Sequence, residues 1–285
     1  MPEVSEIALT AEILYKKLKN KILVSFDFIG GRYGPNRTKP DGFKQFEASL
    51  PLKIKKVDSK GKFLWFELKS GENTWYIMNT FGLTGMWSFF EPRYCKAILT
   101  FSDDTIVYYS DLRNFGTFKF TTEIDVLQQK LSELAPDFLK ETKFNFDKLK
   151  KFPKALIVDI LTDQKKIGSG IGNYLVSEIL YRAKLSPHRT SASLTPTDIE
   201  NLEYWIKYMV KLSYVSNNIG YMVNLTDEAN KIPRKNYHPD IKLGKSDASF
   251  AFSVYRQKTD PVGNKVSVDK RKGGRSTYWV KKVQV

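Results

Sequence analysis

The sequence contains few residues that can cross-link a chain or hold a metal. Among its 285 residues there are one cysteine, Cys95, and two histidines, His188 and His238. One cysteine excludes an intramolecular disulfide and favours a reducing compartment. A closed structural zinc site takes four ligands, so these three residues argue against one. We therefore expect neither a metal nor an organic cofactor.

Long hydrophobic runs are also missing. No apolar run reaches the roughly 18 residues that a membrane span needs. The start, Pro2-Glu3-Val4-Ser5-Glu6, is acidic where a signal peptide would carry basic residues. Internal repeats and low-complexity tracts are absent as well. We expect a folded intracellular protein without a membrane partner, with one large or two ordinary domains.

Positive charge is abundant and unevenly distributed. The net charge is +15, and residues 231–285 alone carry 14 Lys/Arg against 4 Asp. A basic region of this kind favours a polyanion, most often nucleic acid. The alternative is a solvated basic tail. Aromatic residues within the segment favour a folded one: Phe250, Phe252, Tyr255, Tyr278 and Trp279.

The periodicity of apolar residues predicts an α+β fold. Residues 3–19 carry apolar side chains at helical spacing, and Asp103-Asp104 is typical of a hairpin turn. Short, β-branched and aromatic segments predict strands at 22–29, 62–68, 75–79, 86–90, 96–101, 105–109 and 117–120, in an antiparallel sandwich or barrel. Helices are expected at 154–161, 171–184 and 196–215. Three last strands are expected at 251–255, 265–268 and 276–283.

Pro2 is the first candidate for chemistry. Removal of Met1 would leave Pro2 with a free secondary amine, and an α-amine has a pKa of about 8, so part of it is neutral near pH 7. Such an amine can attack a sugar aldehyde carbon and form an iminium that promotes elimination of a phosphate. Glu3 could move the protons. The alternative is an ordinary helix start, where proline and acidic residues are common.

A glycine-rich segment, 167–174, opens the helix expected at 171–184. Glycines let the backbone approach a ligand, and the N–H groups at a helix N-terminus bind phosphate. A Rossmann phosphate loop is excluded because the preceding segment is helical. A simple glycine turn with a helix cap remains the alternative.

Two further segments suit DNA. Arg275 stands near the tip of the basic hairpin, where it can reach a phosphate. Arg113 and Phe115, in segment 110–116, could fill the gap that an extruded base leaves in a duplex. In each case the alternative is a solvated loop or turn.

Each of these segments alone is weak evidence for a function, but their order along the chain indicates one family of proteins. They are Pro2-Glu3 with Glu6, and 61–64, 81–85, 111–116, 170–175, 178–181, 254–258 and 275–279. In order and spacing they resemble the formamidopyrimidine-DNA glycosylase/endonuclease VIII (Fpg/Nei) family over nearly the whole chain. The resemblance is closest to the Nei-like 1 branch, of the giant-virus (mimivirus) type.

The resemblance implies catalytic roles for five residues. Pro2 would be the Schiff-base nucleophile, and Glu3 the proton donor to the deoxyribose. Glu6 would orient groups near the site. Lys62 would be the β-strand lysine that contacts phosphate and assists catalysis. Arg275 would be the finger arginine that binds phosphate and supports the second elimination.

The resemblance also implies a DNA-binding set. Leu83, Arg113 and Phe115 would fill the void after base flipping. Gly170, Gly172 and Asn173, in a helix–two-turn–helix element, would grip the phosphates of the lesion. Lys165 is assigned the phosphate-contact lysine of this element, although a loop about one residue longer than usual leaves Lys166 as an alternative.

The finger departs from the bacterial pattern, because its cysteines are missing and a turn around Val262 replaces a ligand pair. A zincless β-hairpin is therefore expected, held by strand pairing and by Tyr278 and Trp279. The implied domains are an N-terminal catalytic β-sandwich (1–122), a helical helix–two-turn–helix domain (123–245) and the finger (246–285).

The implied function is a bifunctional DNA glycosylase and abasic-site lyase of base excision repair. It would act as a monomer on oxidised pyrimidines and on hydantoin or formamidopyrimidine lesions in duplex or single-stranded DNA. It would work in the nucleus or at a cytoplasmic site of DNA replication. The alternative is a non-catalytic nucleic-acid-binding protein on the same scaffold. Loop 217–221 is a candidate for lesion selection.

Overall fold

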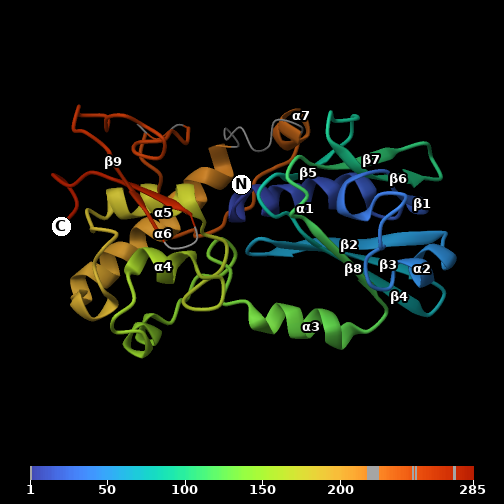
Figure 1. Ribbon diagram of the computed structural model, residues 1–285, viewed down its shortest axis with the longest axis horizontal. Coiled ribbons are helices and arrows are strands. Elements are labelled where there is room, and N and C mark those ends of the chain that lie inside the picture. Colours follow the sequence, from blue (N-terminus) through green and yellow to red (C-terminus); the bar gives the residue numbers. More distant parts are fainter. Residues whose placement is uncertain (1, 217–224, 246, 248, 272–273) are drawn as a thin grey trace. The chain divides into compact units, whose positions relative to one another are not determined.

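The computed structural model describes residues 2–216, 225–245, 247, 249–271 and 274–285, which form two compact units (Figure 1). The first unit comprises Glu6–Glu133, together with Pro2 and segment 225–233. The second comprises Glu3–Ser5, residues 134–216 and the described part of Arg234–Val285. Within these residues, no helix is both long and apolar enough to span a membrane.

The first unit is built on an antiparallel sheet of eight strands in the order β5-β7-β6-β1-β2-β3-β4-β8. The strands are β1 (Ile22–Phe28), β2 (Leu52–Lys60), β3 (Phe63–Ser70), β4 (Asn73–Thr80), β5 (Gly85–Ser88), β6 (Cys95–Phe101), β7 (Ile106–Asp111) and β8 (Thr117–Thr121). The helices of this unit are α1 (Val4–Leu18), the 3-10 turn η1 (Gly31–Tyr33), α2 (Phe43–Ala48), α3 (Ile124–Glu133) and α7 (Thr226–Asn230).

The sheet folds over on itself into a sandwich. Strands β1 and β2 share only two residue pairs, whereas β1 and β6 share five, so the sheet is weakly joined at that point. Rings from the two halves then meet: Trp87 of β5 lies 5.4 Å from Phe66 of β3, and Tyr109 of β7 lies 4.9 Å from Phe118 of β8. The predicted antiparallel β-sandwich is confirmed.

Helix α1 contributes its apolar stripe to the sandwich core. Ile7, Ala11, Leu14 and Leu18 are all buried there, at the helical spacing that the sequence showed. Burial of an aliphatic side chain of this size stabilises the fold by about 1.5–3 kcal/mol. The helix from Ile7 onward therefore completes the core of the sandwich.

The second unit is helical, with a terminal hairpin. Its elements are η2 (Phe146–Lys151), α4 (Ile157–Thr162), α5 (Asn173–Arg182), η3 (Ser191–Ser193), α6 (Pro196–Ser216), β9 (Ser267–Lys270) and β10 (Ser276–Trp279). Strands β9 and β10 pair antiparallel over four residue pairs. Val254, Val266 and Val280 form a small core beneath the hairpin.

Two expectations from the sequence are wrong in detail, and one strand was missed. Residues 251–255 form a turn and no strand, because the buried carboxylate of Glu178 collects the N–H groups of Ser253, Val254 and Tyr255 at 2.8–3.0 Å. Lys62 lies in the turn between β2 and β3, outside either strand. Strand β2 was not expected, although buried residues alternate with exposed lysines along part of it.

Candidate active site and DNA-binding surfaces

Glu3 lies at the N-terminus of α5. Its side chain is 1% exposed, and its carboxylate accepts hydrogen bonds from the N–H groups of Gly172, Tyr174 (3.0 Å) and Leu175 (3.4 Å). These donors otherwise lack partners at the start of a helix, and the helix dipole favours a negative group there. The helix therefore supplies the partners that a buried acidic side chain needs, immediately after Pro2 in the chain.

The other candidate catalytic residues of the N-terminal domain, Pro2, Glu6 and Lys62, belong to the first unit. Pro2 is buried, one residue before Glu3 and two before the start of α1. Glu6 is 2% exposed in the first turn of α1. Lys62 is half-buried and follows Gly61, whose φ of +55° suits the tight turn between β2 and β3.

The glycine loop before α5 is held by backbone and side-chain contacts. The N–H of Val4 donates to the carbonyl of Gly170 at 3.0 Å. A Cβ on Gly170 would lie 2.4 Å from Cβ of Val4, and its φ of +112° disfavours other residues. The side chain of Gln164 accepts from the N–H of Gly170 (2.7 Å) and donates to the carbonyl of Ile171 (3.0 Å). Only glycine fits here, because the N-terminal segment passes so close.

His238 and Phe138 support the same loop from the other side. A Cβ on Gly168 would lie 2.4 Å from the ring of Phe138, and the N–H of Phe138 donates to the carbonyl of Ser169 at 3.0 Å. The buried ring of His238 bonds through Nε2 to the carbonyl of Phe138 at 2.8 Å. Because a carbonyl only accepts, Nε2 carries the proton.

We predict that acid weakens this support. Burial lowers the pKa of His238 from its ordinary 6.5, so protonation favours the unfolded chain and stability falls as the pH drops below that value. His238→Asn suits the φ of +47° at this position and does not titrate. In urea unfolding, the stability difference between wild type and variant should shrink from about pH 7.5 to about pH 5.5, by at most about 1.4 kcal/mol per pH unit. A difference independent of pH would contradict the prediction.

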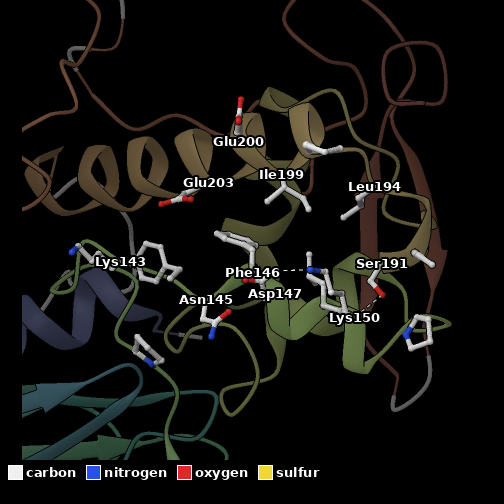
Figure 2. A pocket seen from close by; sticks show the side chains of 16 residues that line it. Lys143, Asn145, Phe146, Asp147, Lys150, Ser191, Leu194, Ile199, Glu200 and Glu203 are labelled. Atoms are coloured by element: carbon white, nitrogen blue, oxygen red, sulfur yellow. Dashed lines mark hydrogen bonds and ion pairs between the residues drawn. The ribbon is translucent and has the colours of Figure 1, made fainter.

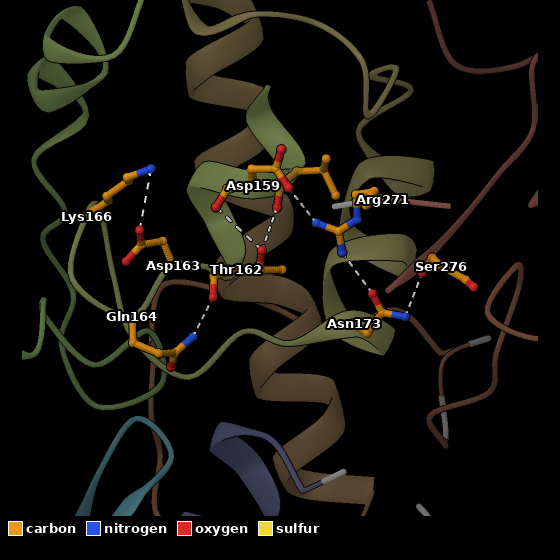
Figure 3. Close-up of polar contacts among 9 residues, drawn as sticks. Asp159, Thr162, Asp163, Gln164, Lys166, Asn173, Arg271 and Ser276 are labelled. Carbon is orange, nitrogen blue, oxygen red and sulfur yellow. Dashed lines mark hydrogen bonds and ion pairs between the residues drawn. The ribbon is translucent and has the colours of Figure 1, made fainter. Parts of the chain in front are cut away.

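Asn173, the first residue of α5, is joined to the terminal hairpin through both ends of its side-chain amide. Its Nδ2 donates to the carbonyl of Ser276 at 2.7 Å, and its Oδ1 accepts from the guanidinium of Arg271 at 2.9 Å (Figure 3). Arg271 also donates to the carboxylate of Asp159 at 2.8 Å. The structure therefore brings Glu3, the glycine loop, Asn173 and the hairpin together at one helix end.

The two candidate lysines differ in their surroundings. Lys165 is exposed, whereas the Nζ of Lys166 lies 3.4 Å from the carboxylate of Asp163 (Figure 3) and 4.7 Å from the ring centroid of Phe152. Lys165 is therefore the more exposed of the two, and its assignment to the phosphate stays a prediction.

Leu83, Arg113 and Phe115 lie on two adjacent loops of the first unit. Gly82 packs so closely that a Cβ there would lie 2.7 Å from Cβ of Phe115, and the guanidinium of Arg113 stands 4.9 Å from the ring centroid of Phe115. Phe115 is 50% exposed, which is unusual for a phenylalanine and suits a stacking surface.

The buried carboxylate of Asp111 fixes the conformation of both loops. It accepts from the hydroxyl of Thr84 on one loop, and from the N–H groups of Arg113 (3.2 Å) and Gly116 (2.7 Å) on the other. The sequence had included Asp111 only in a motif. The tertiary structure shows that it organises the exposed pair beside it.

Arg275 lies in the hairpin turn, and its side chain is exposed. Its carbonyl accepts from the N–H of Arg271 at 2.7 Å. Among the described residues, no side chain bonds to its guanidinium, which leaves the donors available for a phosphate. Lys272 and Gly273 of this turn, and the loop 217–221, lie outside the described residues.

Polar networks hold the hairpin and the turn before it. The carboxylate of Asp260 accepts from the N–H groups of Val262 (3.1 Å) and Asn264 (2.7 Å), in the turn where a zinc-ligand pair was absent from the sequence. The carboxylate of Asp269 accepts from the indole of Trp279 and bonds to the ring of His188 at 2.9 Å. Among the described residues, no group of three His, Cys, Asp or Glu side chains is arranged to hold a metal.

A cavity of about 1070 Å³ also lies in the second unit (Figure 2). Residues within 136–153 and 191–203 line it, and none of the predicted site residues is among them. Its charged side chains have both signs, and Lys150 is paired with Asp147 at 2.8 Å. The cavity is therefore not suited to a polyanion.

Three family models match the chain and together cover most of it. They describe the N-terminal domain (residues 1–118), the H2TH domain (134–220) and the C-terminal domain (239–285) of formamidopyrimidine-DNA glycosylase. Similar proteins include formamidopyrimidine-DNA glycosylases of Mycoplasma mobile, 26% identical over 100% of this chain and 99% of the relative, and of Shouchella clausii, 28% identical over 74% and 77%.

Solved structures share the fold. One is a complex between the Lactococcus lactis Fpg and an abasic site containing DNA, with a TM-score of 0.76, 22% identity and 99% of both chains covered. The family models and the similar proteins define the class as a DNA glycosylase with a β-sandwich and an H2TH domain. The chain belongs to the formamidopyrimidine-DNA glycosylase family, whose members act in base excision repair. The Nei-like, zincless subtype stays a prediction.

Proposed function

We propose that this protein is a bifunctional DNA glycosylase and abasic-site lyase that uses Pro2 as its nucleophile. The observation that carries the proposal is the placement of Glu3, the residue after Pro2, at the N-terminus of α5. An acidic side chain next to a nucleophilic amine, held at a helix N-terminus that a glycine loop precedes, suits amine catalysis on a nucleotide.

The proposed reaction follows from the chemistry of a secondary amine. The Pro2 nitrogen bonds to the anomeric carbon of the sugar while the glycosidic bond breaks; the base leaves with its electron pair and takes up the proton that the Pro2 nitrogen loses. Glu3, in its protonated form, then gives a proton to the ring oxygen as the C1′–O bond of the sugar opens, which produces an iminium and leaves a Glu3 carboxylate. The iminium acidifies the neighbouring carbon, so loss of that proton expels the 3′-phosphate. A second elimination expels the 5′-phosphate, and water releases the sugar fragment from Pro2.

The remaining residues would bind and orient DNA. Arg275 would hold a phosphate during the second elimination, with Lys62 contacting another and Glu6 orienting groups near the amine. The exposed Arg113–Phe115 pair, with Leu83, would occupy the gap left by the flipped nucleotide. We propose damaged DNA, duplex or single-stranded, as the partner, and a monomer as the active form.

The substrates proposed are oxidised pyrimidines, together with hydantoin and formamidopyrimidine lesions. The proposed division is a catalytic sandwich (1–122), a helical DNA-binding domain (123–245) and a zincless finger (246–285), and Leu83, Arg113 and Phe115 of the sandwich would also contact DNA. Because several cations would meet phosphates, affinity should fall steeply with salt.

Borohydride trapping tests the proposal directly. Wild-type protein incubated with an abasic-site oligonucleotide and borohydride should form a covalent complex, because the reductant fixes the iminium. The N-terminal peptide of that complex should carry the sugar remnant on Pro2. If no cross-link forms while the protein demonstrably binds the oligonucleotide, a non-catalytic DNA-binding protein is the better description.

The lysine assignment gives a prediction with a built-in control. Lys165→Ala should weaken binding to an abasic-site duplex and reduce the slope of log affinity against log salt by about 0.9, the value for one phosphate contact. Lys166→Ala should leave that slope unchanged, because Lys166 is engaged with Asp163. Fluorescence anisotropy at several salt concentrations measures both slopes, and the reverse pattern would assign the contact to Lys166.

A further inference from the structure

Arg271, the residue that follows strand β9 of the hairpin, makes two side-chain hydrogen bonds. Its side chain is only 7% exposed. One guanidinium nitrogen donates to Asp159 of α4 at 2.8 Å, and another donates to Asn173 of α5 at 2.9 Å (Figure 3). A single side chain thus joins the hairpin to two helices that are separate in sequence.

The same residue closes the turn that presents Arg275. The N–H of Arg271 donates to the carbonyl of Arg275 at 2.7 Å, and the carbonyl of Ser276, the next residue, accepts from Asn173 at 2.7 Å. Both ends of this turn are therefore fixed to Asn173, one through Arg271 and one directly. Both polar atoms of the Asn173 side chain form hydrogen bonds to the hairpin, whereas the family resemblance implies that Asn173 contacts phosphate.

We infer that Arg271 is a positioning residue that fixes, beside the N-terminus of α5, the backbone of the turn from which Arg275 presents its exposed side chain. The inference rests on the proposed function, in which Arg275 binds a phosphate. A guanidinium suits the task because its planar fork reaches two acceptors at once, whereas an ammonium is a single point charge. Burial makes Arg271 itself a poor phosphate ligand, since Asp159 and Asn173 would first have to be displaced.

Hydrogen exchange of the DNA-free protein tests the structural half. In Arg271→Met, which keeps the apolar stem, amides of residues 267–279 should exchange at least about tenfold faster than in wild type. Amides of the sandwich strands should be unaffected. Lys282→Ala, which removes an exposed cation from the same terminal segment, is the matched control and should not change the hairpin. Equal protection in wild type and Arg271→Met would overturn the inference.

A double-mutant cycle with Arg271 and Arg275 tests whether Arg271 supports DNA binding through Arg275. For an abasic-site duplex, Arg271→Met and Arg275→Ala should each reduce the salt slope by about 0.9, and the double variant should lose no more than Arg275→Ala alone. Arg271→Lys should recover only part of the affinity. If the losses of affinity in the double variant were additive, Arg271 would act independently of Arg275. If the salt slope of Arg271→Met equalled that of Lys282→Ala, Arg271 would have no effect on DNA binding. Either result would overturn the inference.

Asp159→Asn extends the test if Arg271→Met does not fold. Asp159 is half-exposed, so its replacement removes the charge of one partner with little disturbance of the core. Asp159→Asn should reduce the salt slope and the affinity for the abasic-site duplex, by less than Arg271→Met does. When it is combined with Arg275→Ala, neither quantity should fall below its value in Arg275→Ala alone. Because these readouts need only binding, they remain valid if wild type fails to cross-link to abasic DNA, an outcome that would overturn the proposed function alone.

Discussion

Replacing Pro2 with glycine is expected to abolish base excision, lowering its single-turnover rate by at least about a thousandfold, as loss of a covalent nucleophile does. The α-amine of glycine is primary and lacks the ring that sets its direction, so it should not displace a base. Strand cleavage at a preformed abasic site should fall less, because another amine can form an imine with the exposed aldehyde. Gel assays with a lesion oligonucleotide and with an abasic one separate the two steps.

An N-terminal extension supplies the control. A variant with one uncleaved residue before an intact Pro2 keeps the proline ring but converts its amine into an amide, which is not nucleophilic. It should lose base excision as completely as the glycine variant while retaining DNA affinity. Activity in the extended protein, with the extension verified by intact mass, would exclude Pro2 as the nucleophile.

Glu3→Gln is expected to produce the second large effect. Removal of the proton-transfer group should slow base excision by about 10²–10⁴-fold. The structure adds an effect on stability, because the new NH₂ group would face the N–H donors of Gly172, Tyr174 or Leu175. A buried donor without an acceptor costs about 1–3 kcal/mol, so the free energy of unfolding should fall by a similar amount.

Chemical unfolding and single-turnover excision of an oxidised pyrimidine, measured on the same samples, separate the two contributions. Glu3→Asp keeps the charge on a shorter side chain, so it should regain part of the stability and some activity. If Glu3→Gln loses stability but keeps its rate within about threefold, Glu3 is a helix cap and another group transfers the proton.

Local patterns in the sequence were sufficient for much of the architecture. The apolar stripe of α1, the short aromatic strands and the Asp103-Asp104 turn depend on periodicity and turn chemistry within a few residues, and all appear in the structure. The strand predicted at 251–255 is wrong because the apolar pattern of this segment suits a strand, whereas its N–H groups donate to Glu178, some 75 residues earlier in the chain. Such a long-range hydrogen bond leaves no local trace in sequence.

Some features of the candidate site could likewise be predicted from short stretches of sequence, and others depend on tertiary contacts. Amine chemistry at Pro2, the glycine loop and the basic terminal segment could be predicted from the residues, because each depends on the chemical nature of one short stretch. The burial of Glu3 against α5 and the hydrogen bond that joins Asp111 to Thr84 on the neighbouring loop depend on residues far away in the chain. Arg271 is the clearest case, since in sequence it is one cation among several in a hairpin.

By itself the sequence determined that this chain has an N-terminal helix, aromatic strands, a glycine-opened helix and a positively charged terminal segment. These properties follow from side-chain size, charge and periodicity, which act over a few residues. Only the tertiary structure decided which polar groups are already engaged and which remain exposed. The physical reason is that buried donors and acceptors must find partners wherever the fold brings them, as Arg271 does with Asp159 and Asn173.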